Sequence, residues 1–106
     1  MLARLTVRYV VVARLDPPAP GAAAAPAAAV DIIWAGTTAA DRLDHVRARP
    51  AADAHGLDIV IILRAATAGE AVDRARSLCG RAVRAPLLRG WSLKCTDAIA
   101  LADLTL

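Results

Sequence analysis

The sequence predicts an α+β fold in which two helices cover one face of an antiparallel sheet, with the elements in the order β-α-β-β-α-β. Three segments indicate this order. Leu5–Leu15 alternates between two faces as a strand does, Leu57–Leu63 is apolar at nearly every position, and Thr67–Val83 has the spacing of an amphipathic helix. A helix between two strands acts as the crossover, so these segments fit one two-layer sandwich.

Length and composition indicate a single domain over residues 1–106. Its 58% hydrophobic content excludes general disorder. Phenylalanine is absent, so the core must come from valine, isoleucine and leucine, with alanine at close approaches. No apolar run reaches the roughly 20 residues of a membrane span, so we expect no membrane partner. Arg8 and Arg14 interrupt the apolar N-terminal stretch, which argues against an export signal and for a cytoplasmic protein.

A low-complexity Pro/Ala segment at about 16–29 follows the first strand. Its prolines exclude a strand or helix interior, but Pro26 suits the first turn of a helix and Gly36 suits a C-terminal cap. One helical face then carries four apolar residues, Ala27, Val30, Ile33 and Trp34. Val30–Ala35 is also rich in strand-forming residues. We predict a helix there because the crossover position requires one.

Arg42–Arg49 predicts an edge strand, because high charge is how exposed edges resist aggregation. A short helix starting at Thr38 is the alternative. In the strand, one face would carry Leu43, His45 and Arg47, and the other Asp44, Val46 and Ala48. Pro50–Gly56 predicts a turn, and Leu57–Leu63 is apolar enough to be a central strand covered on both faces.

Thr67 is predicted to cap the second helix, with Glu70 reaching back to complete a capping box. The apolar face of that helix consists of Ala71, Val72, Ala75, Leu78, Cys79, Ala82 and Val83. The last strand is expected at Gly90–Cys95. The segment 96–106 either extends this strand or forms a short amphipathic helix.

No catalytic, metal or cofactor site is predicted. The junction Arg64–Glu70 has one glycine and lacks the glycine-rich patterns that cradle phosphates. His45 and His55 lie too far apart, with too few companions, for a zinc site. Because adjacent strand residues point to opposite faces, Asp44 and His45 are not expected to form an acid/base pair.

The predicted arrangement leaves one sheet face open. The helices are expected to cover Leu5, Val7, Tyr9 and Val11 of the first strand and Leu57, Ile59, Ile61 and Leu63 of the third. The open face would then present a set of interface residues, Arg8, Val10, Val12, Val60, Ile62 and Arg64, with Arg14, Asp58 and Lys94 also at the rim. An apolar patch with a charged rim is typical of a protein interface. The alternative is that the segment 96–106 folds over this face.

The element order resembles that of the ferredoxin-like (split βαβ) domains. The resemblance covers most of the chain but rests on no motif, so it carries over no functional residue. Folds of this kind include ligand-sensing regulatory domains and dimeric α+β barrel enzymes with open sheet faces. RNA-recognition domains share the order but expose aromatic rings on the sheet, where this chain has Val10, Val12, Val60 and Ile62. We therefore expect no nucleic-acid partner.

These observations together favour a non-catalytic interaction or regulatory module without a cofactor. It would form a homodimer, or dock on a larger protein, through the aliphatic sheet face. The first alternative is a small dimeric α+β barrel enzyme with a pocket between sheet and helices near Tyr9, His45 and Arg47. The second is phosphate or nucleic-acid binding through the arginines, which number twelve of the thirteen basic residues in a chain of net charge +3.

Overall fold

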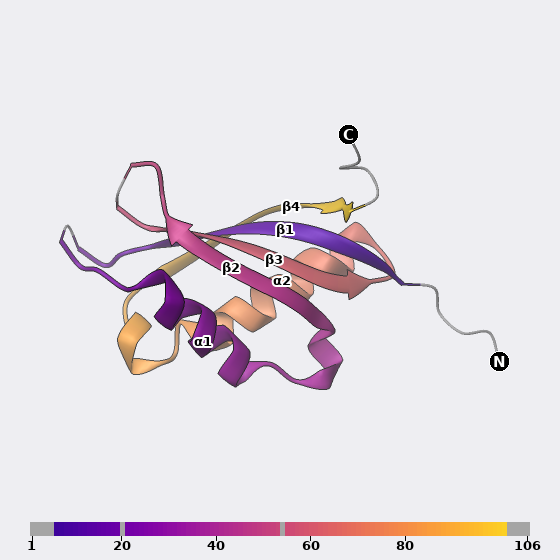
Figure 1. Ribbon diagram of the computed structural model, residues 1–106, viewed down its shortest axis with the longest axis horizontal. Helices are drawn as coiled ribbons and strands as arrows, with labels where there is room; N and C mark the ends of the chain where they lie inside the picture. Colours follow the sequence, from indigo (N-terminus) through magenta and orange to yellow (C-terminus); the bar gives the residue numbers. More distant parts are fainter. Residues whose placement is uncertain (1–5, 20, 54, 102–106) are drawn as a thin grey trace.

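The computed structural model describes residues 6–19, 21–53 and 55–101, with side chains described except at 95–97 (Figure 1). Within this part of the chain the elements follow the predicted order, and two single-turn 3-10 segments are added. The elements are β1 (Val7–Asp16), α1 (Pro26–Gly36), η1 (Ala39–Asp41), β2 (Leu43–Pro50), β3 (Leu57–Ala65), α2 (Ala68–Ala82), η2 (Pro86–Leu88) and β4 (Ser92–Ala100).

In the described residues the strands form one four-stranded sheet in the order β2-β3-β1-β4, and all neighbouring strands are antiparallel. Both helices pack on the same side of this sheet (Figure 1). The predicted α+β class is confirmed, and the arrangement is compatible with a ferredoxin-like sandwich. β1 and β3 form the central pair, as the sequence predicts.

Alternate residues of the two central strands build the core beneath the helices. The fully buried members are Val11, Ala13, Leu15, Ile59, Ile61, Leu63 and Ala65. From α2, the predicted face supplies Ala71, Ala75, Leu78 and Cys79, so small residues let this helix approach the sheet closely. The expected cover of Val7 is wrong: its side chain is exposed, since Val7 is the first residue of β1 and lies in the terminal pair of the β1–β3 ladder.

The segment Val30–Ala35 is helical, which confirms the prediction of α1. Its expected apolar face is shifted, because Ala29 and Ile33 are the buried residues while Ala27 and Trp34 are exposed. Gly36 lies inside the helix. The helix ends where Thr37 turns to an extended conformation and donates its N–H to the Trp34 carbonyl at 3.3 Å.

Thr67 caps α2 as the sequence predicts, but the Glu70 carboxylate reaches the residue before the cap. Thr67 Oγ1 accepts the Glu70 N–H at 3.1 Å, and the Glu70 carboxylate accepts the Ala66 N–H at 3.2 Å. These bonds satisfy backbone donors that a helix start otherwise leaves open. The helix therefore begins at Ala68.

The connection between α1 and β2 is tied to α2 through Asp41 of η1. The Asp41 carboxylate accepts the Thr38 N–H at 2.7 Å and a bond from Arg81 Nη2 at 2.5 Å. The hydroxyls of Thr37 and Thr38 also donate to it, at 3.3 and 3.2 Å, and Asp41 is only 6% exposed, so these partners compensate its charge in place of water. No sequence pattern pointed to this pair, which lies forty residues apart.

The turn Pro50–Gly56 joins β2 to β3, and Ala51 donates its N–H to the Gly56 carbonyl at 2.9 Å. Gly56 packs against β1 so closely that a Cβ there would lie 2.5 Å from the Leu15 carbonyl oxygen. Position 56 therefore requires glycine for space.

At the other end of the chain, β4 extends through residues 96–100 and pairs with β1, so the described part of this segment does not fold over the sheet. The expectation about 102–106, like that about Leu5, lies outside the described residues.

Candidate functional site: the open face of the sheet

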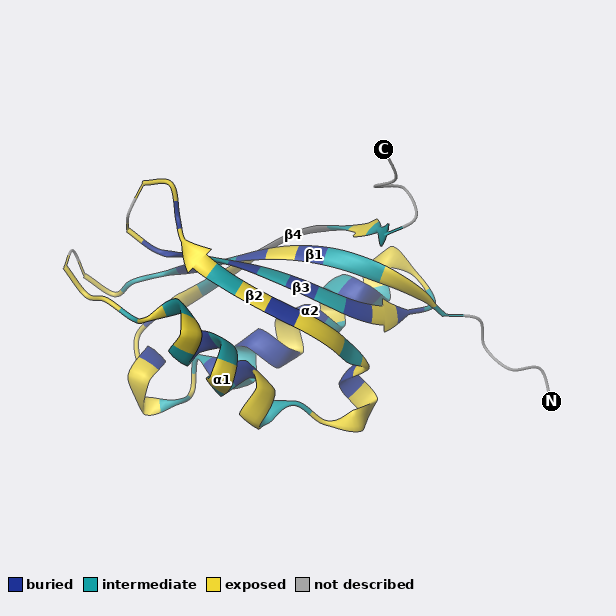
Figure 2. Cartoon of the chain, in the orientation of Figure 1, coloured by how far each residue is buried: buried dark blue, intermediate teal, exposed yellow. Residues whose placement is uncertain are grey.

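The sheet face opposite the helices carries a band of aliphatic side chains. Val10 pairs with Ile62, and Val12 pairs with Val60 across the central strands. On the other flank, Ile99 of β4 lies opposite Val10. Val12 is 39% exposed and Ile99 47% exposed, and the other three are half-buried. Figure 2 shows these intermediate and exposed positions alternating with buried ones along β1. We call Val10, Val12, Val60, Ile62 and Ile99 the aliphatic patch.

The predicted cover of β3 on both faces is therefore wrong. Val60 and Ile62 stay half-buried because both helices lie on the other side of the sheet. An antiparallel sheet with one solvent-facing side usually carries polar residues there. An aliphatic centre on such a side is the departure that singles out this face.

One end of the patch is closed by an acid between two arginines. Asp44 Oδ2 lies 3.1 Å from Arg8 Nε and 3.2 Å from Arg64 Nε. A register shift between Leu43 and His45 makes Asp44 an extra residue in β2. The bulge turns Asp44 toward the open face, where Arg8 and Arg64 also lie.

The other end of the patch is closed by a second charge cluster. Arg14 Nη2 donates to Asp53 Oδ2 at 2.7 Å, and Arg14 Nε donates to Asp16 Oδ1 at 2.9 Å. The hydrogen bond to Asp53 raises the pKa of Arg14, and the same bond lowers the pKa of Asp53 below its usual range. Lys94 lies 3.6 Å from Asp16. This end is therefore a paired network linking β1, β4 and the β2–β3 turn.

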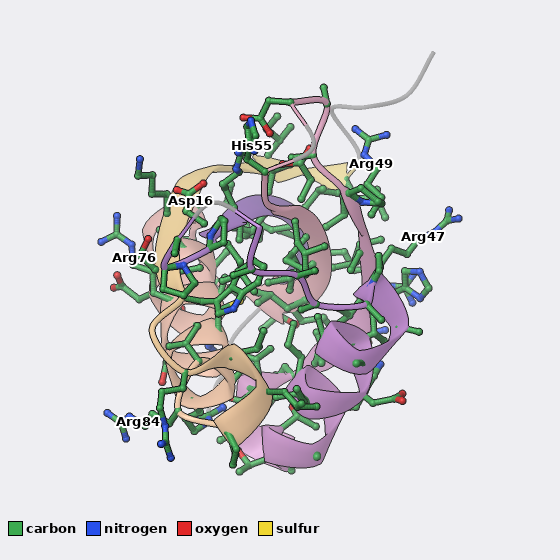
Figure 3. The ribbon with its side chains drawn as sticks, turned by 90° about the vertical axis from the view of Figure 1, so that its left-hand side faces the viewer. Asp16, Arg47, Arg49, His55, Arg76 and Arg84 are labelled. Atoms are coloured by element: carbon green, nitrogen blue, oxygen red, sulfur yellow. The ribbon has the colours of Figure 1, made fainter. Side chains whose placement is uncertain are left out.

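The β2 edge differs from both ends because its cations have no acid. His45, Arg47 and Arg49 lie opposite Ile62, Val60 and Asp58, which places all three on the open face. Among the described residues, neither Arg47 nor Arg49 has a carboxylate within ion-pair distance. Both side chains point outward from β2 in Figure 3. A shallow hollow of about 330 Å³ lies between them and is also lined by Ala48, Asp58 and Val60.

The structure brings the predicted interface residues together but separates the residues predicted to surround an enzyme pocket. Arg8, Val10, Val12, Val60, Ile62 and Arg64 all lie on the open face, in paired register. Tyr9 packs against the core on the helix side, whereas His45 and Arg47 lie on the open side. The three residues expected around an enzyme pocket therefore do not meet.

Two contributors to this face were missed. Ile99 was missed because the sequence left open whether 96–106 extends the last strand or forms a helix, although the alternation of Ile99 with Ala98 and Ala100 carries a strand signal. Asp44 was placed on the face opposite His45, which is wrong because the bulge puts both on the open side. A bulge leaves no fixed sequence signature, so regular alternation gave the wrong face.

The described residues offer little for catalysis. They contain no group of three or more histidine, cysteine or acidic side chains placed to hold a metal ion. The ring of His45 forms no hydrogen bond or ion pair within the described part of the chain, so nothing orients it as an acid or base. Asp44 is instead held by its two arginines. No described helix combines the length and apolar character needed to cross a membrane.

Comparison with known proteins adds no assignment to this geometry: no family model matches the chain, and neither a curated protein nor a solved structure matches it.

Proposed function

We propose that the chain is a non-catalytic interaction module that associates with a second copy of itself through the open face of its sheet. The aliphatic patch is the observation that carries this proposal. It spans β3, β1 and β4 without a polar interruption at the described positions. Such a surface gains free energy when another apolar surface covers it.

Charge at the two ends of the patch favours a second copy as the occupant. One end has two cations, Arg8 and Arg64, and one acid, Asp44. The other end has three acids, Asp16, Asp53 and Asp58, and three cations, Arg14, Lys94 and Arg49, which lies opposite Asp58. A two-fold copy whose strands run in the opposite direction sets the positive end of one chain against the end of the other that has more acids.

The expected association is weak and reversible. Each patch side chain is already partly buried, so covering it gains about 1 kcal/mol, and ten side chains in two copies gain about 10 kcal/mol. Association costs about 4–15 kcal/mol in lost freedom. The surplus is at most about 6 kcal/mol, which predicts dissociation constants of tens of micromolar or weaker and no obligate dimer.

The test is sedimentation velocity over a concentration series that extends well above micromolar. We expect the wild type to shift toward a dimer, while Val60→Asp remains a folded monomer because an unpaired carboxylate would be buried in the interface. Ile62→Asp should behave likewise. Leu87→Asp is the matched control, since Leu87 is 69% exposed on η2 in the helix layer.

A wild type that stays monomeric throughout, including one that binds only a larger protein, would contradict the second-copy proposal. So would a Val60→Asp variant that dimerises as the wild type does. A dimer lost equally in Leu87→Asp would locate the contact elsewhere.

The proposal places the module in the cytoplasm. Arg8 and Arg14 both lie within β1, where an export signal would need an uninterrupted apolar segment. Recovery of the full chain in the cytosolic fraction of its source cells tests this location, and recovery outside that compartment contradicts it.

A further inference from the structure

The outer edge of β2 has backbone groups that no strand pairs within the described residues. β2 lies at the end of the sheet order. In an antiparallel ladder, every second residue of a strand exchanges backbone hydrogen bonds with its partner. Ala51 donates its N–H to the Gly56 carbonyl, so the hydrogen-bonded residues of β2 are Arg49 and Arg47, two and four residues earlier. Val46 and Ala48 must then turn their N–H and C=O groups away from β3. These two residues offer a short row of donors and acceptors at the edge.

The arginines along the same edge form no ion pair within the described residues, although Asp58 of β3 lies opposite Arg49. Arg47 and Arg49 are two residues apart on one strand, so their side chains share a face about 7 Å apart. Elsewhere on this face Arg8 and Arg64 share Asp44, and Arg14 is held by two acids. With Asp58 counted, Arg47 and Arg49 still leave a net positive charge for an external partner, and the hollow that these three residues line leaves room beside it.

We propose that β2 binds an extended acidic segment of a partner protein, which adds to the sheet as a further strand. Its backbone bonds Val46 and Ala48, and acidic side chains at alternate positions lie beside Arg47 and Arg49 on the open face. Pro50 has no N–H, so it limits the added strand at that end of β2.

Arg47 and Arg49 also disfavour pairing of this edge with the β2 edge of a second copy. Two β2 edges from two copies would bring Arg47 and Arg49 against like charges, which is destabilising directly across a strand pair. A partner with acids at every second residue removes that repulsion and replaces it with opposite-charge pairs. The edge is therefore selective for a segment unlike β2 itself.

The test is titration calorimetry of the full chain with a short synthetic peptide that carries glutamate at alternate positions and valine or threonine between them. We expect measurable binding, and about a tenfold or greater loss in the double variant Arg47→Glu/Arg49→Glu. A peptide with lysine in place of glutamate should bind that variant and not the wild type. Arg76→Glu/Arg84→Glu is the matched control, because both arginines are exposed on the α2 side of the molecule and the net change in charge is the same (Figure 3).

Backbone methylation of the peptide separates strand addition from simple charge attraction. Methyl groups on the alternate nitrogens that face β2 should abolish binding, while methyl groups on the intervening nitrogens should be tolerated. Equal effects of the two methylated peptides would overturn the proposal in favour of unstructured electrostatic binding. Unchanged affinity in Arg47→Glu/Arg49→Glu, or an equal loss in the control variant, would also overturn it.

Discussion

Asp41→Ala is expected to lower the free energy of unfolding by about 2.5–4 kcal/mol, although Asp41 belongs to a single-turn segment. The variant removes the acceptor of the Thr38 N–H, and loss of a cap costs about 1 kcal/mol. It also removes the charged acceptor of Arg81, a bond worth about 1.5–3 kcal/mol. Arg81 Nε is buried without a hydrogen-bond partner, but Nη1 donates to Ser77 Oγ at 3.4 Å and the side chain is 35% exposed, so solvent screening favours the lower end of the range.

Urea unfolding at neutral pH measures this change. Asp44→Ala is the control, because its ion pairs with Arg8 and Arg64 are solvent-exposed and should contribute less than about 1 kcal/mol. If Asp41→Ala and Asp44→Ala shifted the midpoint equally, burial of the Asp41–Arg81 pair would not be what holds η1 to α2.

The pH dependence of the same variant gives a second measurement. Burial alone would raise the pKa of Asp41, but the bonds from Arg81 and the Thr38 N–H outweigh it, so the pKa lies below its ordinary value of 3.8. A group whose folded pKa is depressed stabilises fully above the unfolded pKa. The wild-type advantage over Asp41→Ala should therefore persist at neutral pH and disappear as the pH falls through the lowered pKa.

Three further variants test separate parts of the structure. Thr67→Ala should cost about 1 kcal/mol in urea unfolding through loss of the α2 cap, and an unchanged midpoint would mean that the bond to Glu70 contributes nothing. Gly56→Ala should cost about 1–3 kcal/mol, because its Cβ would lie 2.5 Å from the Leu15 carbonyl oxygen, and a neutral result would show that the turn shifts freely. Replacing His45 and His55 by glutamine together should leave circular dichroism and self-association unchanged, whereas the loss of a bound metal or an activity would make the barrel-enzyme alternative the leading one.

Elements with a strong periodicity of apolar residues could be predicted from the sequence. Features that depend on tertiary contacts could not. The apolar run of β3 and the capped, amphipathic α2 follow from local patterns that agree with the fold. The helix α1 was correctly predicted from its position in the topology, but its buried face was not. The choice of Ala29 and Ile33 over Trp34 depends on how the helix docks against β2 and α2, which the segment itself does not encode.

The open face was predictable at its centre because β1 and β3 are regular. Once their pairing is known, alternation alone puts Val10, Val12, Val60 and Ile62 together. The face was mispredicted at the β2 border, where the strand bulges at Asp44, and was left undecided at the β4 border, where the strand runs on to Ala100. Edge strands have one ladder partner instead of two, so fewer contacts fix their register and length.

The bulge at Asp44 has an evolutionary consequence. A deletion of this one codon would leave Leu43 and His45 adjacent, opposite Leu63 and Ile62, and would restore a regular ladder with every other side chain on its present face. The deletion would nonetheless strip Arg8 and Arg64 of their shared acid. A single in-frame deletion would therefore change the charge at one end of the open face while preserving the sheet. The charge of this surface can thus evolve without a change of fold.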